Sequence, residues 1–204
     1  MEQIYPTYST IEVFDSTYTM TKDITLDGAI VECGIAAGSN FAQMIKASID
    51  SKIDREYWGY DSFEGIPFGI EWDKEQPGIG VMNPGKYGVL ETTGITAHNI
   101  TGVIDNLKKW GVWSEKVTLV KGWFQNTVSK TKPDKIAVLR LDGDLYESTK
   151  VCLDNLYDNV QKGGLIIIDD YELAGCKKAV DEFLKKRRAS KKLQRFSYIA
   201  YWYK

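Results

Sequence analysis

The sequence predicts an α/β fold, in which a mostly parallel β-sheet is covered by helices on both faces. Short apolar runs alternate along the chain with segments whose apolar residues recur at helical spacing, a pattern typical of parallel strands joined by crossover helices. Two runs, 136–141 and 165–168, are almost entirely aliphatic, as expected for strands covered on both faces. The 204 residues are enough for one domain that spans the whole chain, residues 1–204.

The first half of the chain contains two expected strands and one long irregular segment. Residues 29–33 form the first strand, and a glycine turn leads from it to a helix capped by Ser39 or Asn40. Residues 56–61 form the second strand. The segment at about 64–96 is rich in glycine and holds three of the five prolines. Loops of that length are uncommon in compact domains unless they are lids or binding loops, so we expect this one to shape a substrate pocket.

The second half continues the alternation of helices and strands. Helical spacing of apolar residues predicts helices at 97–110, 149–160 and 175–188. Further strands are expected at 117–121, 136–141 and 165–168, with Gly163 and Gly164 ending the connection before the last of them. The tail, 193–204, is rich in aromatic and β-branched residues, which favours a closing hairpin or strand.

Composition excludes several classes of partner. The net charge is −2, which gives no electrostatic reason to expect nucleic acid or a membrane surface. The three cysteines form no C-x-x-C pair and their number is odd, so we expect reduced thiols. The first ten residues lack a basic region followed by an apolar stretch. We therefore expect no signal peptide and a cytoplasmic location.

A glycine motif follows the first expected strand: Glu32-x-Gly34-x-x-x-Gly38. Glycines there allow a tight turn and let backbone N–H groups approach a ligand. The dinucleotide fingerprint G-x-G-x-x-G is absent. A pyrophosphate is disfavoured by a nearby carboxylate, whereas the ammonium group of a sulfonium amino acid can be held by one. The motif therefore favours such a cofactor, and a plain turn without a ligand is the alternative.

Asp61 ends the second expected strand. An acid at this place can accept hydrogen bonds from both ribose hydroxyls of an adenosine. The alternative is a cap or turn residue within Asp-Ser-Phe-Glu-Gly. Together with the glycine motif, the ribose role is favoured.

Four carboxylates follow two neighbouring strands. Asp142 and Asp144 come after the run 136–141, and Asp169 and Asp170 come after 165–168. Neighbouring parallel strands lie ~4.8 Å apart and end at the same edge of the sheet, so these acids would repel one another unless protons or cations compensate. Oxygen ligands without histidine or cysteine select Mg²⁺ or Ca²⁺.

Helix capping is the alternative explanation for two of these acids. Asp144 and Glu147 have the spacing of a capping box. Asp170 could equally cap the helix that follows it.

The sequence resembles the macrocin O-methyltransferase family, which includes enzymes that methylate sugar hydroxyls in macrolide and aminocoumarin antibiotics. The resemblance covers most of residues 30–183, and its blocks occur in the family's order: DSFEGIP (61–67), VTLVKGWFQNTV (117–128), LRLDGDLYEST (139–149), GGLIIIDDY (163–171) and KKAVDEF (177–183). It implies a Rossmann-like class I methyltransferase fold with a seven-stranded sheet, S-adenosylmethionine as methyl donor and one Mg²⁺. The family's usual G-x-x-x-G-G reads Gly34-Ile-Ala-Ala-Gly38-Ser39 here.

The resemblance also implies roles for individual residues. Asp142, Asp169 and Asp170 correspond to the family's metal ligands, and Asp144 to its general base. The positions that match the family's cofactor-binding residues are Glu32, Gly34, Asp61, Ser62, Gly122 and Trp123. A sugar hydroxyl is then the expected acceptor, and a homodimer is compatible with the resemblance.

Other functions fit the sequence less well. A nicotinamide-dependent dehydrogenase would need the absent G-x-G-x-x-G motif. A non-catalytic S-adenosylmethionine-binding module would have no need of a costly charge cluster, and a catechol-type phenol is the alternative acceptor. His98, the only histidine, is expected at the surface at the start of a helix. The basic run 185–192 is expected to be a solvated helix end favoured by the helix dipole, with contact to an anionic substrate as the alternative.

Overall fold

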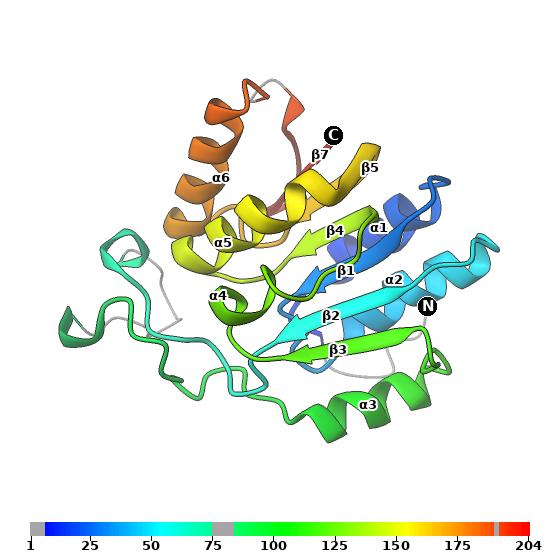
Figure 1. The fold of residues 1–204 in the computed structure, drawn as a ribbon, viewed down its shortest axis with the longest axis horizontal. Coiled ribbons are helices and arrows are strands. Elements are labelled where there is room, and N and C mark those ends of the chain that lie inside the picture. The colour runs from blue at the N-terminus through cyan, green and yellow to red at the C-terminus, as the bar shows by residue number, and fades with distance from the viewer. Residues whose placement is uncertain (1–6, 75–83, 190–191) are drawn as a thin grey trace.

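Seven strands form one sheet, as the sequence predicts (Figure 1). The computed structural model describes residues 7–74, 84–189 and 192–204. The strand order is β3-β2-β1-β4-β5-β7-β6. The strands are β1 (Ala29–Cys33), β2 (Tyr57–Asp61), β3 (Val117–Lys121), β4 (Ile136–Leu141), β5 (Val160–Ile168), β6 (Gln194–Phe196) and β7 (Ile199–Tyr203). Neighbours from β3 to β5 pair in parallel, whereas β7 is antiparallel to both β5 and β6, so the predicted closing hairpin is confirmed.

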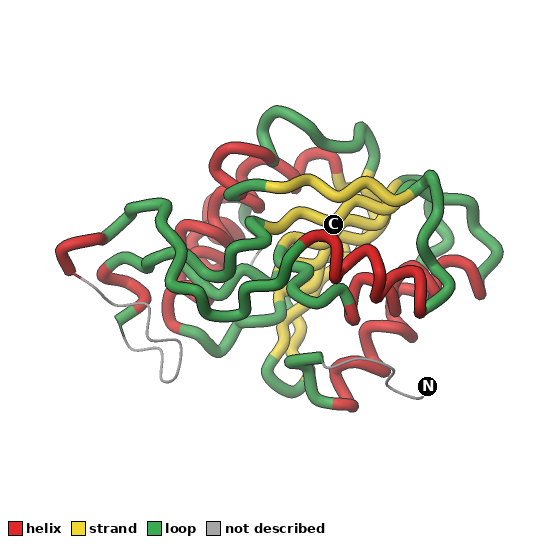
Figure 2. Tube along the Cα trace, turned by 90° about the horizontal axis from the view of Figure 1, so that it is seen from below, coloured by secondary structure: helices red, strands yellow, loops and turns green. Residues whose placement is uncertain are grey.

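Helices cover both faces of the sheet (Figure 2). One face packs against α1 (Ile11–Lys22), α2 (Ser39–Asp50) and α3 (Ile100–Lys109), and the other against α4 (Phe124–Thr127), α5 (Tyr146–Leu156) and α6 (Ala174–Lys186). Buried side chains of β1 alternate between the two cores: Ile30 joins Phe41 of α2, while Val31 and Cys33 join the core beneath α5 and α6. Because strand residues are buried on both faces of the sheet, the central strands appear in the sequence as nearly continuous apolar runs.

Several element boundaries differ from the predicted ones. The N-cap of α2 is Gly38, at φ 87°, and no side chain caps this helix, so the predicted capping by Ser39 or Asn40 is wrong. Strand β5 begins at Val160 and contains Gly163 and Gly164, which were predicted to precede it. Helix α5 covers 146–156 instead of 149–160, and α3 begins at Ile100. Helix α1 was not predicted.

The long segment after β2 has little regular structure where it is described. It contains two short 3₁₀ turns, η1 (Glu71–Asp73) and η2 (Pro84–Lys86), and one bridge between Pro67 and Thr92. Residues 75–83 of the predicted loop lie outside the described residues. A third 3₁₀ turn, η3 (Tyr157–Asn159), links α5 to β5.

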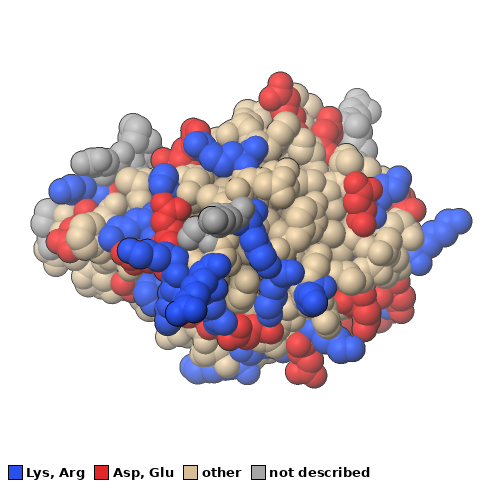
Figure 3. All heavy atoms as spheres, turned by 90° about the horizontal axis from the view of Figure 1, so that it is seen from above, with Lys and Arg blue, Asp and Glu red and all other residues tan. Residues whose placement is uncertain are grey.

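The surface offers no single-sign field on the face seen in Figure 3, where basic side chains are bordered by acidic ones. This mixture agrees with the small net charge of −2. Within 7–74, 84–189 and 192–204, every helix is too short or too polar to cross a bilayer.

Candidate active site

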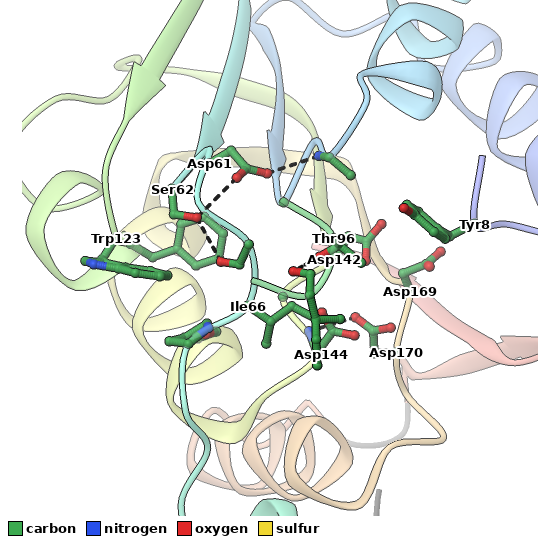
Figure 4. A pocket seen from close by; sticks show the side chains of 18 of the residues that line it. Tyr8, Asp61, Ser62, Ile66, Thr96, Trp123, Asp142, Asp144, Asp169 and Asp170 are labelled. Carbon is green, nitrogen blue, oxygen red and sulfur yellow. Dashed lines mark hydrogen bonds between the residues drawn. The ribbon is translucent and has the colours of Figure 1, made fainter. Parts of the chain in front are cut away.

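A cavity of about 360 Å³ opens at the carboxyl ends of the parallel strands (Figure 4). Its wall contains residues within two positions of the ends of β1 to β5, together with Tyr8 from the N-terminal segment and Tyr198 from the turn between β6 and β7. This is where open α/β sheets bind ligands, and the volume lies in the range of small-molecule sites. Most of the predicted site residues therefore converge on one cavity: Gly34, Asp61, Ser62, Trp123, Asp142, Asp144, Asp169 and Asp170.

The last backbone hydrogen bonds of the sheet hold these turns in place. The amide of Gly34 donates to the carbonyl of Tyr60 at 2.8 Å, and that of Asp142 donates to Cys33 at 2.9 Å. The amides of Gly122 and Asp169 continue the series toward the two sides, to the carbonyls of Asp61 and Leu141 at 2.9 Å each. These hydrogen bonds thus fix where each turn begins at the carboxyl edge of the sheet.

Gly34 occupies a position that no other residue could share. Its φ is 89°, and a Cβ added there would lie 1.7 Å from the backbone oxygen of Asp142. The turn after β1 therefore touches the turn after β4, and both face the cavity. Gly38 does not line the cavity, and its left-handed conformation starts α2.

Asp61 links the turns after β1 and β2. Its carboxylate accepts hydrogen bonds from the amides of Ala36 at 3.0 Å and Phe63 at 2.7 Å, while the hydroxyl of Ser62 donates to Gly65 at 2.9 Å. Burial raises the pKa of Asp61, and the two amides oppose that shift. Asp61 thus makes the contacts of a turn residue, which was the alternative interpretation. It also lines the cavity, and its role in binding a ribose stays a prediction.

Three carboxylates come together on the opposite side of the cavity. Among the described residues, Asp142, Asp144 and Asp170 each place an oxygen within 4.8 Å of the other two. Asp169 lies beside them, but its carboxylate points to Arg140, with Oδ1 2.6 Å from the guanidinium. The arrangement groups Asp144, rather than Asp169, with Asp142 and Asp170. The predicted ligand set of Asp142, Asp169 and Asp170 stays a prediction.

Burial, more than mutual repulsion, raises the pKa values of Asp144, Asp169 and Asp170. Burial, followed by the charges of Asp142 and Asp169, raises the pKa of Asp144 to about 8. Burial and the neighbouring Asp144 raise the pKa of Asp170 well above its ordinary value. The pKa of Asp169 is raised to about 6 because burial outweighs the attraction of Arg140. A group of oxygens that holds protons this firmly is also suited to a hard divalent cation.

The capping explanations for Asp144 and Asp170 are wrong. Helix α5 has Leu145 as its N-cap and α6 has Leu173, and neither N-cap side chain accepts a hydrogen bond from its helix. Asp144 instead has φ 55°, and its amide donates to the carboxylate of Asp170 at 2.9 Å. The two acids therefore shape the site and do not serve as helix caps.

Arg140 is a site residue that the sequence analysis missed. Its guanidinium is completely buried and forms ion pairs with Glu32, with Asp142 at 2.9 Å and with Asp169 at 2.6 Å. The signal was present, because Arg140 is the one charged residue within the aliphatic run IAVLRL. It supplies part of the positive charge that the acidic cluster needs.

Glu32 lies behind the floor of the cavity. It is directly opposite Arg140 in the pairing of β1 with β4, is fully buried, and does not contribute to the cavity wall. Burial raises its pKa to about 8, and the nearby Arg140 opposes this. In this arrangement the Glu32 side chain does not reach the surface of the cavity, and its role in cofactor binding stays a prediction.

Aromatic side chains form the two ends of the cavity. Trp123 follows β3 and lines the end beside Asp61, whereas Tyr8 lies at the other end beside Asp169 (Figure 4). Gly122 is outside the wall and, at φ 138°, turns the chain toward Trp123. The partly buried His98 places Nε2 3.3 Å from the hydroxyl of Tyr8 in a solvent-exposed contact and is not part of the cavity wall.

The described part of the basic run 185–192 is not part of the cavity wall. Lys185 and Lys186 form the last turn of α6 and are exposed, and Arg187 pairs with Asp158 at 2.7 Å. Residues 190–191 of this run lie outside the described residues. The described part fits the predicted helix end.

Comparison with known proteins identifies the family. The profile of the macrocin O-methyltransferase family, TylF, matches residues 12–204. Demethyldecarbamoylnovobiocin O-methyltransferase of Streptomyces niveus is 37% identical over 162 residues, which are 78% of this chain and 59% of that protein. Mycinamicin III 3''-O-methyltransferase of Micromonospora griseorubida is 33% identical over 158 residues, 76% of this chain and 60% of that protein. The chain thus spans about three fifths of the length of these relatives.

A solved structure shows the same fold. The O-methyltransferase NovP is 31% identical, with a TM-score of 0.80 over 95% of this chain and 80% of that one. The seven-stranded, mostly parallel sheet is accordingly the Rossmann-like class I methyltransferase sheet that the sequence predicted. The matched profile extends from α1 to the last strand, and the chain therefore belongs to the macrocin O-methyltransferase family.

Proposed function

We propose that the chain transfers a methyl group from S-adenosylmethionine to a hydroxyl of a sugar-containing small molecule, with Mg²⁺ held by its carboxylates. One observation carries this proposal. A single cavity is lined at one end by Asp61 and Trp123, and at the other by three carboxylates whose oxygens lie within 4.8 Å of one another. A further relative from Streptomyces olivaceus, 33% identical, is named as a 4'-O-methyltransferase of a dimethoxyrhamnosyl tetracenomycin, which supports a sugar hydroxyl as the acceptor.

The residues after β1 to β3 would hold the donor. Asp61 would accept the ribose hydroxyls, and Trp123 would form the wall beside the adenosine. Gly34 has no side chain, so the backbone of this turn can lie against the amino-acid end of the donor. The cavity volume of about 360 Å³ leaves room for a ligand of this class.

The residues after β4 and β5 would hold the metal and the acceptor. Asp142, Asp169 and Asp170 would hold a hard cation, with Asp169 using the oxygen that does not pair with Arg140. Mg²⁺ would supply Lewis-acid stabilisation of negative charge on the acceptor oxygen. Asp144 would accept the proton of the acceptor hydroxyl. As that proton leaves, the O–CH₃ bond forms and the S–CH₃ bond of the donor breaks, which leaves S-adenosylhomocysteine. Positioning of the two reactants contributes much of the rate.

Asp142→Ala is expected to abolish Mg²⁺-dependent methyl transfer while leaving S-adenosylmethionine binding within about twofold of wild type. The side chain faces the carboxylate group, whereas its backbone oxygen, which touches the donor turn at Gly34, is unchanged. Formation of S-adenosylhomocysteine with demethyldecarbamoylnovobiocin or mycinamicin III as acceptor measures activity, and calorimetry measures binding of each ligand. Equal loss of both ligands would contradict the assignment, and an inactive wild type with either acceptor and Mg²⁺ would contradict the proposed reaction.

Mg²⁺ is expected to stabilise the folded protein more at pH 8.5 than at pH 6. In the metal-free protein, the raised pKa values of Asp144, about 8, and Asp169, about 6, mean that the folded state binds more protons than the unfolded chain above pH 4. Stability therefore falls as the pH rises through this window. Bound metal replaces the protons, and its advantage grows with pH. Thermal unfolding with and without Mg²⁺ at both pH values tests this, with Asp142→Ala as the control; equal shifts at both values would contradict it.

We propose one catalytic domain over residues 1–204, a cytoplasmic location and a homodimer.

A further inference from the structure

Asp73 is completely buried, although it lies in the long irregular segment after β2. Its carboxylate accepts two backbone hydrogen bonds. One comes from the amide of Ile70 in its own segment, at 2.9 Å to Oδ2, and the other from the amide of Tyr146 at the start of α5, at 2.9 Å to Oδ1. A buried carboxylate needs such donors to offset its lost hydration, so the position of Asp73 depends on both.

A glycine makes room for this carboxylate. A Cβ added to Gly175, in the first turn of α6, would lie 1.8 Å from Oδ1 of Asp73. The carboxylate therefore lies against the starts of both α5 and α6, where the helix dipoles favour a negative charge. The neighbouring Trp72 packs beneath Lys178 of α6, with 4.5 Å between the ammonium and the ring. The segment is thus attached to both helices.

The hydrogen bond at Tyr146 reaches the turn that carries Asp144. Only Leu145 separates the two residues, and Asp144 has a left-handed backbone with φ 55°. From the other side, the amide of Asp144 donates to Asp170 at 2.9 Å. This turn is therefore held at two points: by the carboxylate group on one side and by Asp73 on the other.

The same segment also forms a wall of the cavity. Ile66 and Pro67 line the cavity, and Ile66 clusters with Leu145 and Ile95. Residues 66–73 accordingly connect the acceptor side of the cavity with the backbone next to Asp144. A shift of either end would move the other.

We propose that Asp73 is a positioning residue that couples this wall of the acceptor pocket to the geometry of Asp144. The proposal rests on the proposed function for the role of Asp144 as base. It adds that the loop contributes to the methyl-transfer rate through a backbone contact 73 residues away in sequence, in addition to any contact with the acceptor itself.

Two variants displace the carboxylate from opposite sides. Asp73→Asn keeps the shape, but its amide nitrogen cannot accept, so one of the two hydrogen bonds is lost. Gly175→Ala fills the space next to Oδ1 from α6 and leaves the loop sequence intact. Alanine ordinarily stabilises a helix relative to glycine, so a harmful effect at 175 would run against helix propensity. Gly102→Ala in α3 is the matched control, because its nearest contact would be an ordinary 3.5 Å.

Both variants are expected to lower kcat by roughly 10- to 100-fold, as a displacement of about 1 Å can, and to leave the Kd for S-adenosylmethionine within about twofold. Amide hydrogen exchange at Tyr146 should become faster in both, and Gly102→Ala should change neither quantity. Unchanged exchange and kcat would overturn the proposal. Faster exchange with an unchanged kcat would overturn it as well, since Asp73 would then only attach the loop.

The proposed function can fail separately from this inference. If the wild type forms no S-adenosylhomocysteine with either acceptor, the proposed reaction fails, and with it the catalytic half of the inference. The exchange rate of Tyr146 still decides whether Asp73 and Gly175 hold the start of α5. Slower turnover of both variants beside an active wild type supports the proposal and the reaction together.

Discussion

Asp144→Asn is expected to lower kcat by about 10²- to 10⁴-fold, the usual contribution of a general base. Asparagine retains an oxygen toward the acidic group but cannot take up the proton of the acceptor hydroxyl. It also tolerates the left-handed backbone at φ 55°, so the turn and the amide contact to Asp170 should persist. Binding of S-adenosylmethionine and Mg²⁺ is therefore expected to stay within a few-fold of wild type. Single-turnover formation of S-adenosylhomocysteine, together with calorimetry of each ligand, measures the two effects.

Asp154→Asn provides the matched control for this substitution. Asp154 lies on α5 and forms a solvent-exposed ion pair with Lys150 at 2.6 Å. The same chemical change there should leave kcat unaltered. Normal turnover by Asp144→Asn would remove Asp144 as the base, and a comparable loss in Asp154→Asn would show that the effect is not specific to the site.

Arg140→Met is expected to lower the free energy of unfolding by about 3–5 kcal/mol, the usual effect of removing one partner from a buried ion pair. The loss arises because Glu32 and Asp169 would remain buried without their cation. Adding Glu32→Gln should recover part of that loss, since the neutral amide needs no counter-charge. Denaturation in urea at neutral pH, compared across the single and double variants, measures the coupling.

An exposed arginine serves as the control for Arg140. Arg195 pairs with Glu172 at 2.7 Å, and both side chains are more than half exposed. Arg195→Met should change stability by no more than about 1 kcal/mol. A loss at Arg140 as small as that at Arg195 would mean that the acidic group does not depend on this guanidinium.

The central strands could be predicted from the sequence because they carry little besides aliphatic residues. β4 and residues 165–168 of β5 are buried on both faces, so these runs are aliphatic apart from Arg140, and the acids that follow them mark the strand ends. That combination was enough to predict that Asp142, Asp144, Asp169 and Asp170 converge.

Other features depend on contacts that local patterns do not report. Helix α1 escaped prediction because two of its four buried residues are Thr17 and Thr21, which weaken the apolar periodicity. Asp144 matched a capping box by spacing, but its left-handed backbone moves the helix start to Tyr146. The pairing of Arg140 with Glu32 follows from the register of β1 against β4, which the sequence of either strand alone does not contain.

The contact between Gly34 and the backbone of Asp142 has a consequence for protein engineering. Since a single added carbon at residue 34 would collide with the neighbouring turn, the turns after β1 and β4 form one unit for recombination. A chimera should therefore exchange both turns or neither. Tyr8 and Ile66, in contrast, reach the cavity from chain segments outside the sheet, so new acceptor preferences are best sought by grafting those segments from a relative.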